Sequence, residues 1–273
     1  MKKYFRPRKF INEMIYNFNE LGFVKKIKKF FAGQNHLLPQ KCYCNLCDKY
    51  FFSFLMIGEK GKLAKQHNLI GMGPRRGGCP MCGSSDKYRW LYYVLRNYTE
   101  IFIKQCSVLH FAPEKVISNK ICENKQVYYV TGDKVDGLAD SVIDMTDIHY
   151  SDNTFDYVIA GMVLEHIEDE RRALSELKRV CKPQGKIILA IPFCEDMKST
   201  LSNPEIKSQD DKMRYYGHRD HVRLYGRDYA QRIADFGLVE VVCHKPKDIW
   251  TDREIKRNGL QGDYSIIIAT KRD

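Results

Sequence analysis

Four cysteines arranged as two Cys-x2-Cys pairs are the residues of this sequence with the clearest chemistry. Cys44 and Cys47 form one pair and Cys79 and Cys82 the other, with 31 residues between the pairs. Each pair can place two thiolates on one metal ion, and two such turns build the closed, tetrahedral site of a structural zinc ribbon. A closed site leaves no position for a substrate, so we expect a structural Zn²⁺. Cys42 is a spare thiol that could replace Cys44.

The alternative interpretation of these cysteines is a set of free thiols in a linker without a fold. A hairpin over residues 51–56 would fill part of the segment between the pairs, and without metal the segment has little else to form a core. Disulfides are disfavoured for a chain expected in the cytoplasm. The other five cysteines are scattered through apolar segments, as buried free thiols are: Cys106, Cys122, Cys181, Cys194 and Cys243.

A reaction that uses an oxygen nucleophile needs a nearby side chain to accept the proton of that oxygen. Three histidines of this sequence could act as such a general base. His166 follows a predicted buried strand, whereas His218 and His221 lie in the polar run GHRDHVRLYG. Arg223 and Tyr225 in that run could hold an acidic or sugar substrate. The alternative for His166 is a structural role, packed at the start of a helix. The alternative for the polar run is a surface loop whose side chains form hydrogen bonds with its own backbone.

Two aspartates end predicted strands, where a nucleotide-like ligand would bind. Asp133 follows Glu114 by 19 residues, a spacing that suits a carboxylate bound to ribose hydroxyls. Asp144, with Met145 beside it, could bracket a purine. A nicotinamide dinucleotide is disfavoured, because no Gly-x-Gly-x-x-Gly is present to approach a pyrophosphate. The expected ligand is therefore nucleotide-like but lacks a pyrophosphate.

A strand–helix–strand unit at residues 155–192 organises the chain around these side chains. Short apolar runs at residues 157–160 and 187–191 predict buried strands, and the helical spacing between them predicts a covering helix. We expect that helix to include Cys181 and Lys182 and to stop at the following proline and glycine. Two strands joined by a helix imply a crossover and a parallel sheet.

Seven predicted strands alternate with helices in the second part of the chain, starting near residues 107, 127, 142, 157, 187, 238 and 264. The fold class is therefore α/β, with a Rossmann-like sheet of seven mostly parallel strands and helices on both faces. A ligand would bind at the carboxyl ends of the strands. We expect a basic helical arm at residues 1–41, a zinc-ribbon-like module with a linker helix at 42–99, and the sheet domain at 100–273.

Positive charge is concentrated in the predicted arm. The net charge of the chain is +11, and residues 1–41 hold ten Lys and Arg against two Glu, which is +8. An apolar stripe with lysines around it at residues 23–31 could lie on an anionic membrane, contact nucleic acid, or pack on the main domain. No apolar run of about 18 residues predicts a transmembrane helix, and no signal peptide pattern follows the basic start. We expect a cytoplasmic protein, with peripheral contact at the inner face of the membrane as an alternative.

Taken together, these motifs resemble the class I S-adenosylmethionine-dependent methyltransferases of the type 11 kind. More narrowly, they resemble a bacterial subgroup with a cysteine-rich segment of the CPMCGS type. The resemblance covers about residues 42–270, and it implies a cofactor, S-adenosylmethionine, over the first two strands and an antiparallel last strand. The motifs that carry it are VLHFAPE, YVTGD, DMTDIHYSDNTFDYVIAGMVLEHIEDERRALSELKRVCKPQGKIILAIPF and DHVRLYGRDYAQRIADFG.

The resemblance also implies roles for individual residues. Asp133 takes the ribose, and Asp144 with Met145 holds the adenine. Gly161 and Met162, with the next two residues, line the floor beside the methionine end. The first cofactor loop consists of His110, Phe111, Ala112, Pro113 and Glu114. This loop departs from the acidic-x-Gly-x-Gly turn of the wider superfamily, as the narrower subgroup also does.

The leading functional hypothesis is methyl transfer to a small molecule or a glycan precursor, at oxygen. The fourth strand ends in AGMVLEH and lacks the Asn/Asp-Pro-Pro-aromatic pattern of amino-directed nucleic acid methyltransferases, so nucleic acid is the less favoured acceptor. The alternatives are a nucleic-acid-binding zinc-ribbon protein, an RNA methyltransferase that uses the basic arm, and a methyltransferase-like scaffold without catalysis. The oligomeric state has no signal in the sequence.

Overall fold

The structure is a computed structural model that describes residues 41–58 and 61–272. The predicted basic arm at residues 1–41 lies outside the described residues, apart from Lys41. None of the helices within the described ranges has the length and apolar composition needed to cross a bilayer.

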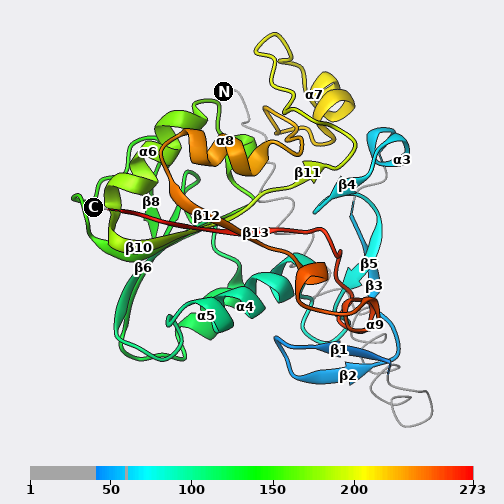
Figure 1. Ribbon diagram of the computed structural model, residues 1–273, viewed down its shortest axis with the longest axis horizontal. Helices are drawn as coiled ribbons and strands as arrows, with labels where there is room; N and C mark the ends of the chain where they lie inside the picture. Colours follow the sequence, from blue (N-terminus) through cyan, green and yellow to red (C-terminus); the bar gives the residue numbers. More distant parts are fainter. Residues whose placement is uncertain (1–40, 59–60, 273) are drawn as a thin grey trace.

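A seven-stranded sheet forms the centre of the molecule (Figure 1). Its spatial order is β12-β13-β10-β9-β6-β7-β8, and β13 runs antiparallel to both of its neighbours. The other neighbouring pairs, from β10 to β8, are parallel. The predicted sheet and its antiparallel last strand are therefore confirmed. The strands are β6 (Cys106–Phe111), β7 (Val127–Asp133), β8 (Ser141–Val142), β9 (Phe155–Gly161), β10 (Cys181–Ala190), β12 (Val239–His244) and β13 (Ile266–Thr270).

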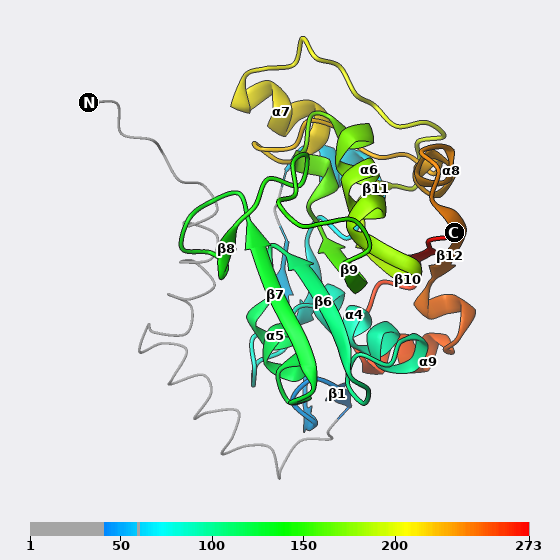
Figure 2. The same ribbon diagram turned by 90° about the vertical axis from the view of Figure 1, so that its left-hand side faces the viewer.

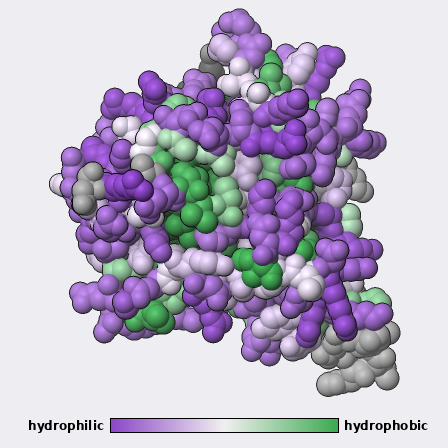
Figure 3. All heavy atoms as spheres, in the orientation of Figure 1, coloured by the Kyte–Doolittle hydropathy of each residue, from purple (hydrophilic) through white to green (hydrophobic). Residues whose placement is uncertain are grey.

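Helices cover both faces of this sheet, α4 and α5 on one and α6 and α8 on the other (Figures 1 and 2). Each helix buries one apolar stripe: Ala173, Leu174 and Leu177 of α6 are fully buried. The face shown in Figure 3 is mainly hydrophilic, with a hydrophobic area left of its centre. The helices are α4 (Asp86–Tyr98), α5 (Lys115–Ile121), α6 (Glu170–Val180), α8 (Tyr229–Asp235) and α9 (Asp252–Arg257), with short 3-10 turns η1 (Leu164–His166) and η2 (Pro246–Asp248).

The helix of the strand–helix–strand unit ends earlier than we predicted. Helix α6 stops at Val180, and Cys181 already belongs to β10, where it pairs with Phe155 of β9. Pro183 explains the difference, because its ring disfavours the helical conformation of Lys182. The prediction that Cys181 and Lys182 belong to the helix was wrong.

The cysteine-rich segment folds into two small antiparallel pairs of strands. Strand β1 (Cys42–Cys44) pairs with β2 (Lys49–Phe51), and β3 (Leu55–Ile57) pairs with β5 (Arg75–Gly78). The predicted hairpin over residues 51–56 is therefore wrong, since β3 pairs with a strand further along the chain. Phe51 and Phe54 belong to the same buried apolar cluster as the central sheet. The segment thus shares its core with the sheet and has more support than its metal site alone.

A lid, defined here as residues 193–226, lies at the edge of the sheet where the parallel strands end, beside the cysteine-rich segment (Figure 1). Its strand β11 (Phe193–Cys194) pairs with β4 (Leu69–Ile70) of that segment. The two parts also share a small apolar cluster, which contains Leu69, Cys194, Tyr216 and Leu224. The helices at this contact are α3 (Leu63–Gln66) and α7 (Gln209–Tyr216).

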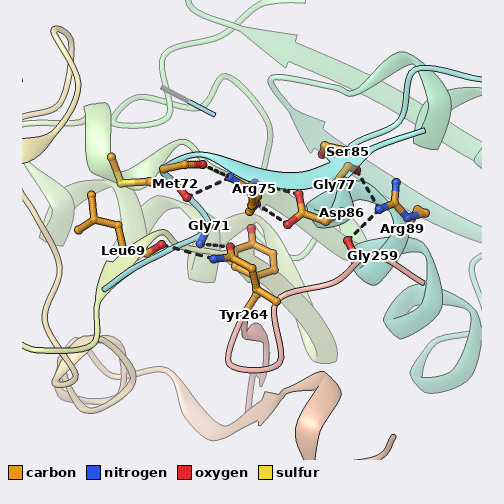
Figure 4. A network of polar contacts seen from close by, with 12 residues as sticks. Leu69, Gly71, Met72, Arg75, Gly77, Ser85, Asp86, Arg89, Gly259 and Tyr264 are labelled. Carbon is orange, nitrogen blue, oxygen red and sulfur yellow. Dashed lines mark hydrogen bonds and ion pairs between the residues drawn. The ribbon is translucent and has the colours of Figure 1, made fainter. Parts of the chain in front are cut away.

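Two arginines, Arg75 and the buried Arg89, hold the cysteine-rich segment against the sheet domain (Figure 4). Arg75 forms a bidentate pair with Asp86, at 2.6 and 2.8 Å. Arg89, which is 1% exposed, donates to the carbonyl oxygens of Gly77 and Ser84 in the segment. Arg89 also donates to the carbonyl oxygens of residues 258 and 259, which precede β13. One guanidinium therefore joins two parts of the chain about 170 residues apart.

We predict that Arg89→Lys lowers the free energy of unfolding by about 2 to 4 kcal/mol, because an ammonium cannot replace the guanidinium fork and leaves buried carbonyls unpaired. Urea unfolding followed by circular dichroism measures this. The matched control is Arg96→Lys at an exposed position of the same helix. Equal unfolding midpoints for the two variants would contradict the structural role of Arg89.

Candidate functional site

The ends of four parallel strands meet at one edge of the sheet and bring most of the predicted cofactor residues together. Phe111, the last residue of β6, is in register with Gly132 on β7 and with Ala160 on β9. Asp133 and Gly161 follow directly, so the loop after β6 lies between them. Strand β6 is also where the order of the sheet reverses, which is where open α/β sheets bind ligands.

Two residues at this edge hold a left-handed backbone that is unusual for side chains other than glycine. Ala112 after β6 has φ +47°, and Met162 after β9 has φ +57°. Their amides donate to the carbonyls of Gly132 and Ala190, at 2.8 and 2.7 Å. Each conformation costs about 1 to 2 kcal/mol, and such strain gathers at functional sites. Ala112 thus adopts a turn conformation that glycine adopts more easily, so the HFAPE loop folds tightly without glycine.

A buried histidine positions the carboxylate of this loop. His110 is fully buried, with Nε2 3.0 Å from Oε2 of Glu114 and Nδ1 2.8 Å from the hydroxyl of Tyr129. The other carboxylate oxygen of Glu114, Oε1, lies against Gly161 at the end of β9. A Cβ atom at Gly161 would be only 3.1 Å from this oxygen. The side chain of His110 therefore orients Glu114, and Glu114 presents a carboxylate at the strand edge.

The two predicted aspartates also lie at strand ends, in different environments. Asp133 is 4% exposed, and its Oδ1 accepts the amide of Val135 at 2.9 Å. Asp144 lies beyond β8, where one oxygen accepts from Thr146 and the other pairs with Lys134 at 2.6 Å. Partial burial raises the pKa of Asp144, but the bonds from Lys134 and Thr146 outweigh it and place the pKa at about 2. An adenine amine would have to displace the exposed Lys134, which surface pairs permit at little cost.

The arrangement fits a nucleoside with an attached amino acid. A carboxylate at the end of β7 suits ribose hydroxyls, and Glu114 suits an ammonium group. Two surface hollows of about 330 and 350 Å³ lie elsewhere, beside α4 and α5 and beside α6. Neither contains a residue at the ends of β7 or β9, so we assign the site from the strand ends.

The three histidines that we considered separately lie together in one cluster, His166, His218 and His221. The ring of His221 lies 4.7 Å from each of the other two, between ring centroids. His166 ends η1, which begins two residues after Met162, whereas the other two belong to the lid. The cluster therefore joins the lid to the edge of the sheet that carries the cofactor residues.

Arg223 explains why the cluster forms. It is 3% exposed and donates to the carbonyls of Leu164 and Ile167, both at 2.6 Å, and to that of Glu168 at 2.8 Å. The amide of Val222 donates to Glu165 in the same turn. The lid is thus fastened to η1 by its own backbone and by one guanidinium.

The expectation that Arg223 and Tyr225 hold substrate is therefore wrong. The hydroxyl of Tyr225 is buried and donates to Oε1 of Glu170 at 2.5 Å, and Arg232 pairs with the other oxygen of Glu170. The side chains of Arg223 and Tyr225 both form hydrogen bonds inside the protein. Their polar character in the sequence reflects buried hydrogen bonds from the lid to residues 164–170, which span η1 and the start of α6.

Lys87 is a site residue that the sequence did not reveal. It lies in the first turn of α4, near Glu114 and Glu165 and near His221. Burial lowers the pKa of Lys87, and the positive charge of Arg75 lowers it further. The neighbouring carboxylates act in the opposite direction, but the net shift is downward. A cation is disfavoured at a helix N-terminus, so a lysine in the first turn of the linker helix was the available signal.

The four predicted metal ligands meet at a single point. The sulfurs of Cys44, Cys47, Cys79 and Cys82 lie within 4.8 Å of one another, and Cys44–Cys82 and Cys47–Cys79 are both 3.8 Å apart. A tetrahedral Zn²⁺ site with bonds of 2.3 Å has sulfur–sulfur edges of about 3.8 Å. The donors therefore fit zinc well. Cys42 lies outside the group, and its sulfur donates to the carbonyl of Phe52 at 3.5 Å.

The charge of this thiol group also favours a cation. Hydrogen bonds from the other three cysteines lower the pKa of Cys44, whereas the bond with Cys44 raises the pKa of Cys47. The Cys44 thiolate therefore makes the ionisation of Cys47 and Cys79 costly. A divalent cation would remove that repulsion and let all four bind as thiolates.

The strand order and the carboxylates at the strand ends define a Rossmann-like domain that suits a nucleoside cofactor. Residues 97–189, from the end of α4 to β10, match the family described as a methyltransferase domain. This part of the chain is therefore similar to methyltransferase domains.

Individual relatives match only parts of the chain. A demethylmenaquinone methyltransferase of Bacillus mycoides is 48% identical over 42 residues, which are 15% of this chain and 18% of that protein. Phosphoethanolamine N-methyltransferase 1 of Arabidopsis thaliana is 27% identical over 135 residues, which are 48% of this chain and 26% of that protein. The chain thus covers about a quarter or less of these relatives.

Among solved structures, 1,6-didemethyltoxoflavin-N1-methyltransferase of Burkholderia thailandensis, with bound S-adenosylhomocysteine, is 14% identical to this chain. The match covers 62% of this chain and 72% of that one, with a TM-score of 0.43.

We predict that Cys44→Ser removes about one equivalent of zinc per chain relative to the parent protein, because three thiolates no longer close the tetrahedron. Elemental analysis of the purified full-length protein measures this. Cys42→Ser is the matched control and should keep the parental zinc content. Equal zinc contents in the two variants would contradict the assigned ligand set.

Proposed function

We propose that this protein transfers a methyl group from S-adenosylmethionine to a small-molecule acceptor. The observation that carries the proposal is the meeting of the β6 loop, Asp133 and Gly161 at the point where the strand order reverses. Two relatives, a demethylmenaquinone methyltransferase and a phosphoethanolamine N-methyltransferase, are named for small acceptors, which supports a small acceptor here.

Different residues at this edge would bind different parts of the cofactor. Asp133 would accept from the ribose hydroxyls, and Asp144 with Met145 would hold the adenine. Glu114, oriented by His110, would pair with the ammonium of the methionine end above Gly161. The bound cofactor supplies a sulfonium methyl group, so the protein mainly has to hold an acceptor in line with that group.

The acceptor would lie between the strand edge and the roof formed by the lid and the cysteine-rich segment. Lys87, His166 and His218 are each partly exposed. A cation and imidazoles favour an acidic acceptor with a hydroxyl group, which agrees with transfer to oxygen. A glycan precursor that carries an acid group remains within this class. Contact of the basic arm with a membrane or nucleic acid stays a prediction.

We predict that Asp133→Ala weakens the binding of S-adenosylmethionine at least about fivefold, or about 1 kcal/mol, by removing charged hydrogen bonds to the ribose. Isothermal titration calorimetry measures this. Asp136→Ala removes the same charge at an exposed position of the next loop and is the control. Unchanged affinity of the Asp133 variant would disprove the ribose assignment. No heat with the folded parent protein would favour the non-catalytic scaffold.

We predict that Glu114→Gln weakens the binding of S-adenosylmethionine at least about fivefold. The same substitution should change the binding of 5′-methylthioadenosine by less than about twofold. The second ligand keeps the nucleoside and lacks the amino acid, so it lacks the ammonium that Glu114 would pair with. Asp133→Ala should weaken both ligands. The exposed Glu123→Gln is the control. Equal losses for both ligands in the Glu114 variant would refute this assignment.

A further inference from the structure

The histidine cluster has the composition and the spacing of a metal centre distinct from the four cysteines. One ring nitrogen from each of His166, His218 and His221 lies within 4.8 Å of the others. In a tetrahedral site with metal–nitrogen bonds of 2.0–2.1 Å, those nitrogens are about 3.3 Å apart. The rings would therefore have to close by up to about 1.5 Å. Two of the three belong to the lid, so a small shift of the lid would bring them together.

His221 gives an independent reason to expect a ligand. It is 4% exposed, and its Nδ1 has no hydrogen-bond partner in the part of the chain that the structure describes. A buried polar atom left without a partner is costly, so native proteins rarely keep one without a use.

Three further groups surround the cluster. Glu165 is fully buried, and its carboxylate lies 4.0 Å from Nε2 of His166, where it would balance a bound cation and orient the ring. Two contacts oppose a metal. Lys87 is a nearby positive charge, and Nδ1 of His218 accepts the amide of Asp220 at 3.2 Å. That hydrogen bond is long, and a metal bound to the same nitrogen would replace it.

We propose that His166, His218 and His221 bind one divalent transition metal ion that takes the hydroxyl oxygen of the methyl acceptor as a further ligand. Imidazole ligands suit Zn²⁺, Co²⁺, Ni²⁺ and Fe²⁺, and three protein ligands leave a position open. The metal would also fasten the lid to η1, in addition to Arg223. The catalytic part of this inference rests on the proposed methyl transfer, whereas the metal site itself does not.

The metal would change which form of the acceptor is present. A bound hydroxyl loses its proton to solvent near neutral pH, as metal-bound water does, and leaves an alkoxide. The oxygen of the alkoxide then forms a bond to the methyl carbon as the bond from carbon to sulfur breaks. The electron pair of that bond stays on sulfur, which becomes the neutral thioether of S-adenosylhomocysteine. The products are a methyl ether, S-adenosylhomocysteine and one proton.

The test is titration of Co²⁺ into the full-length protein after saturation of the four-cysteine site with one equivalent of Zn²⁺, followed by calorimetry and by visible absorption. We expect about one further equivalent of Co²⁺, with ligand-field bands and without the thiolate charge-transfer band of the cysteine site. His166→Gln and His218→Gln should each weaken this binding at least about tenfold, since even ligand-supporting residues have effects of that size. Both positions are partly exposed, so these variants avoid a change in the core.

His67→Gln is the matched control, because His67, Cys194 and Asp196 form a second group that could hold a metal. It should leave the further equivalent of Co²⁺ in place. Loss of that equivalent in His67→Gln, its retention in a His166→Gln/His218→Gln double variant, or no binding by the parent protein would each overturn the proposal. The affinity for S-adenosylmethionine, measured on the same samples, separates failure of the metal site from failure of the proposed methyl transfer.

Discussion

The parallel pairing of β6 with β7 on one side and β9 on the other is the constraint on which the rest of the structure depends. Parallel strands end at the same edge, and each must be followed by a crossover that leaves the sheet. Because the crossovers on the two sides of β6 leave toward opposite faces, their loops separate and an opening remains above β6. Glu114, Asp133 and Gly161 lie at that opening by virtue of their places at strand ends.

Three arginines, of which Arg89 and Arg223 are buried, turn this open edge into a covered site. Arg75 and Arg89 hold the cysteine-rich segment in place, and Arg223 holds the lid to η1. Arg89 and Arg223 donate to backbone carbonyls, so their bonds depend on chain geometry and not on the side chains they meet. A planar fork with several donors does this better than a lysine. The cysteine site then sets the shape of the segment that Arg89 holds.

The sequence predicted the sheet and its edge well, for a physical reason. Strands buried on both faces are continuous apolar runs, and the polar residue that ends each run marks the edge.

The end of α6 was missed because the restriction imposed by Pro183 acts on the residue before it. Cys42 and Cys44 could not be separated by their face of the strand, since both point to the same side of β1 and only the position of the other three sulfurs selects Cys44. Arg223 was misread because a charged residue in a polar run gives no sign of burial. The histidine cluster needed that arginine to bring residues 166 and 218–221 together, so no local pattern could have predicted it.

Hydrogen–deuterium exchange of the full-length protein, with and without S-adenosylmethionine, tests the central claim most directly. The account predicts that the cofactor slows exchange at residues 110–114, 132–134, 144–145 and 161–163, which lie at the ends of four neighbouring strands. Residues of α9, on another part of the molecule, should exchange at unchanged rates. Protection elsewhere, with these four segments unaffected, would contradict the proposed site. The absence of any protection at saturating cofactor would contradict the proposed function.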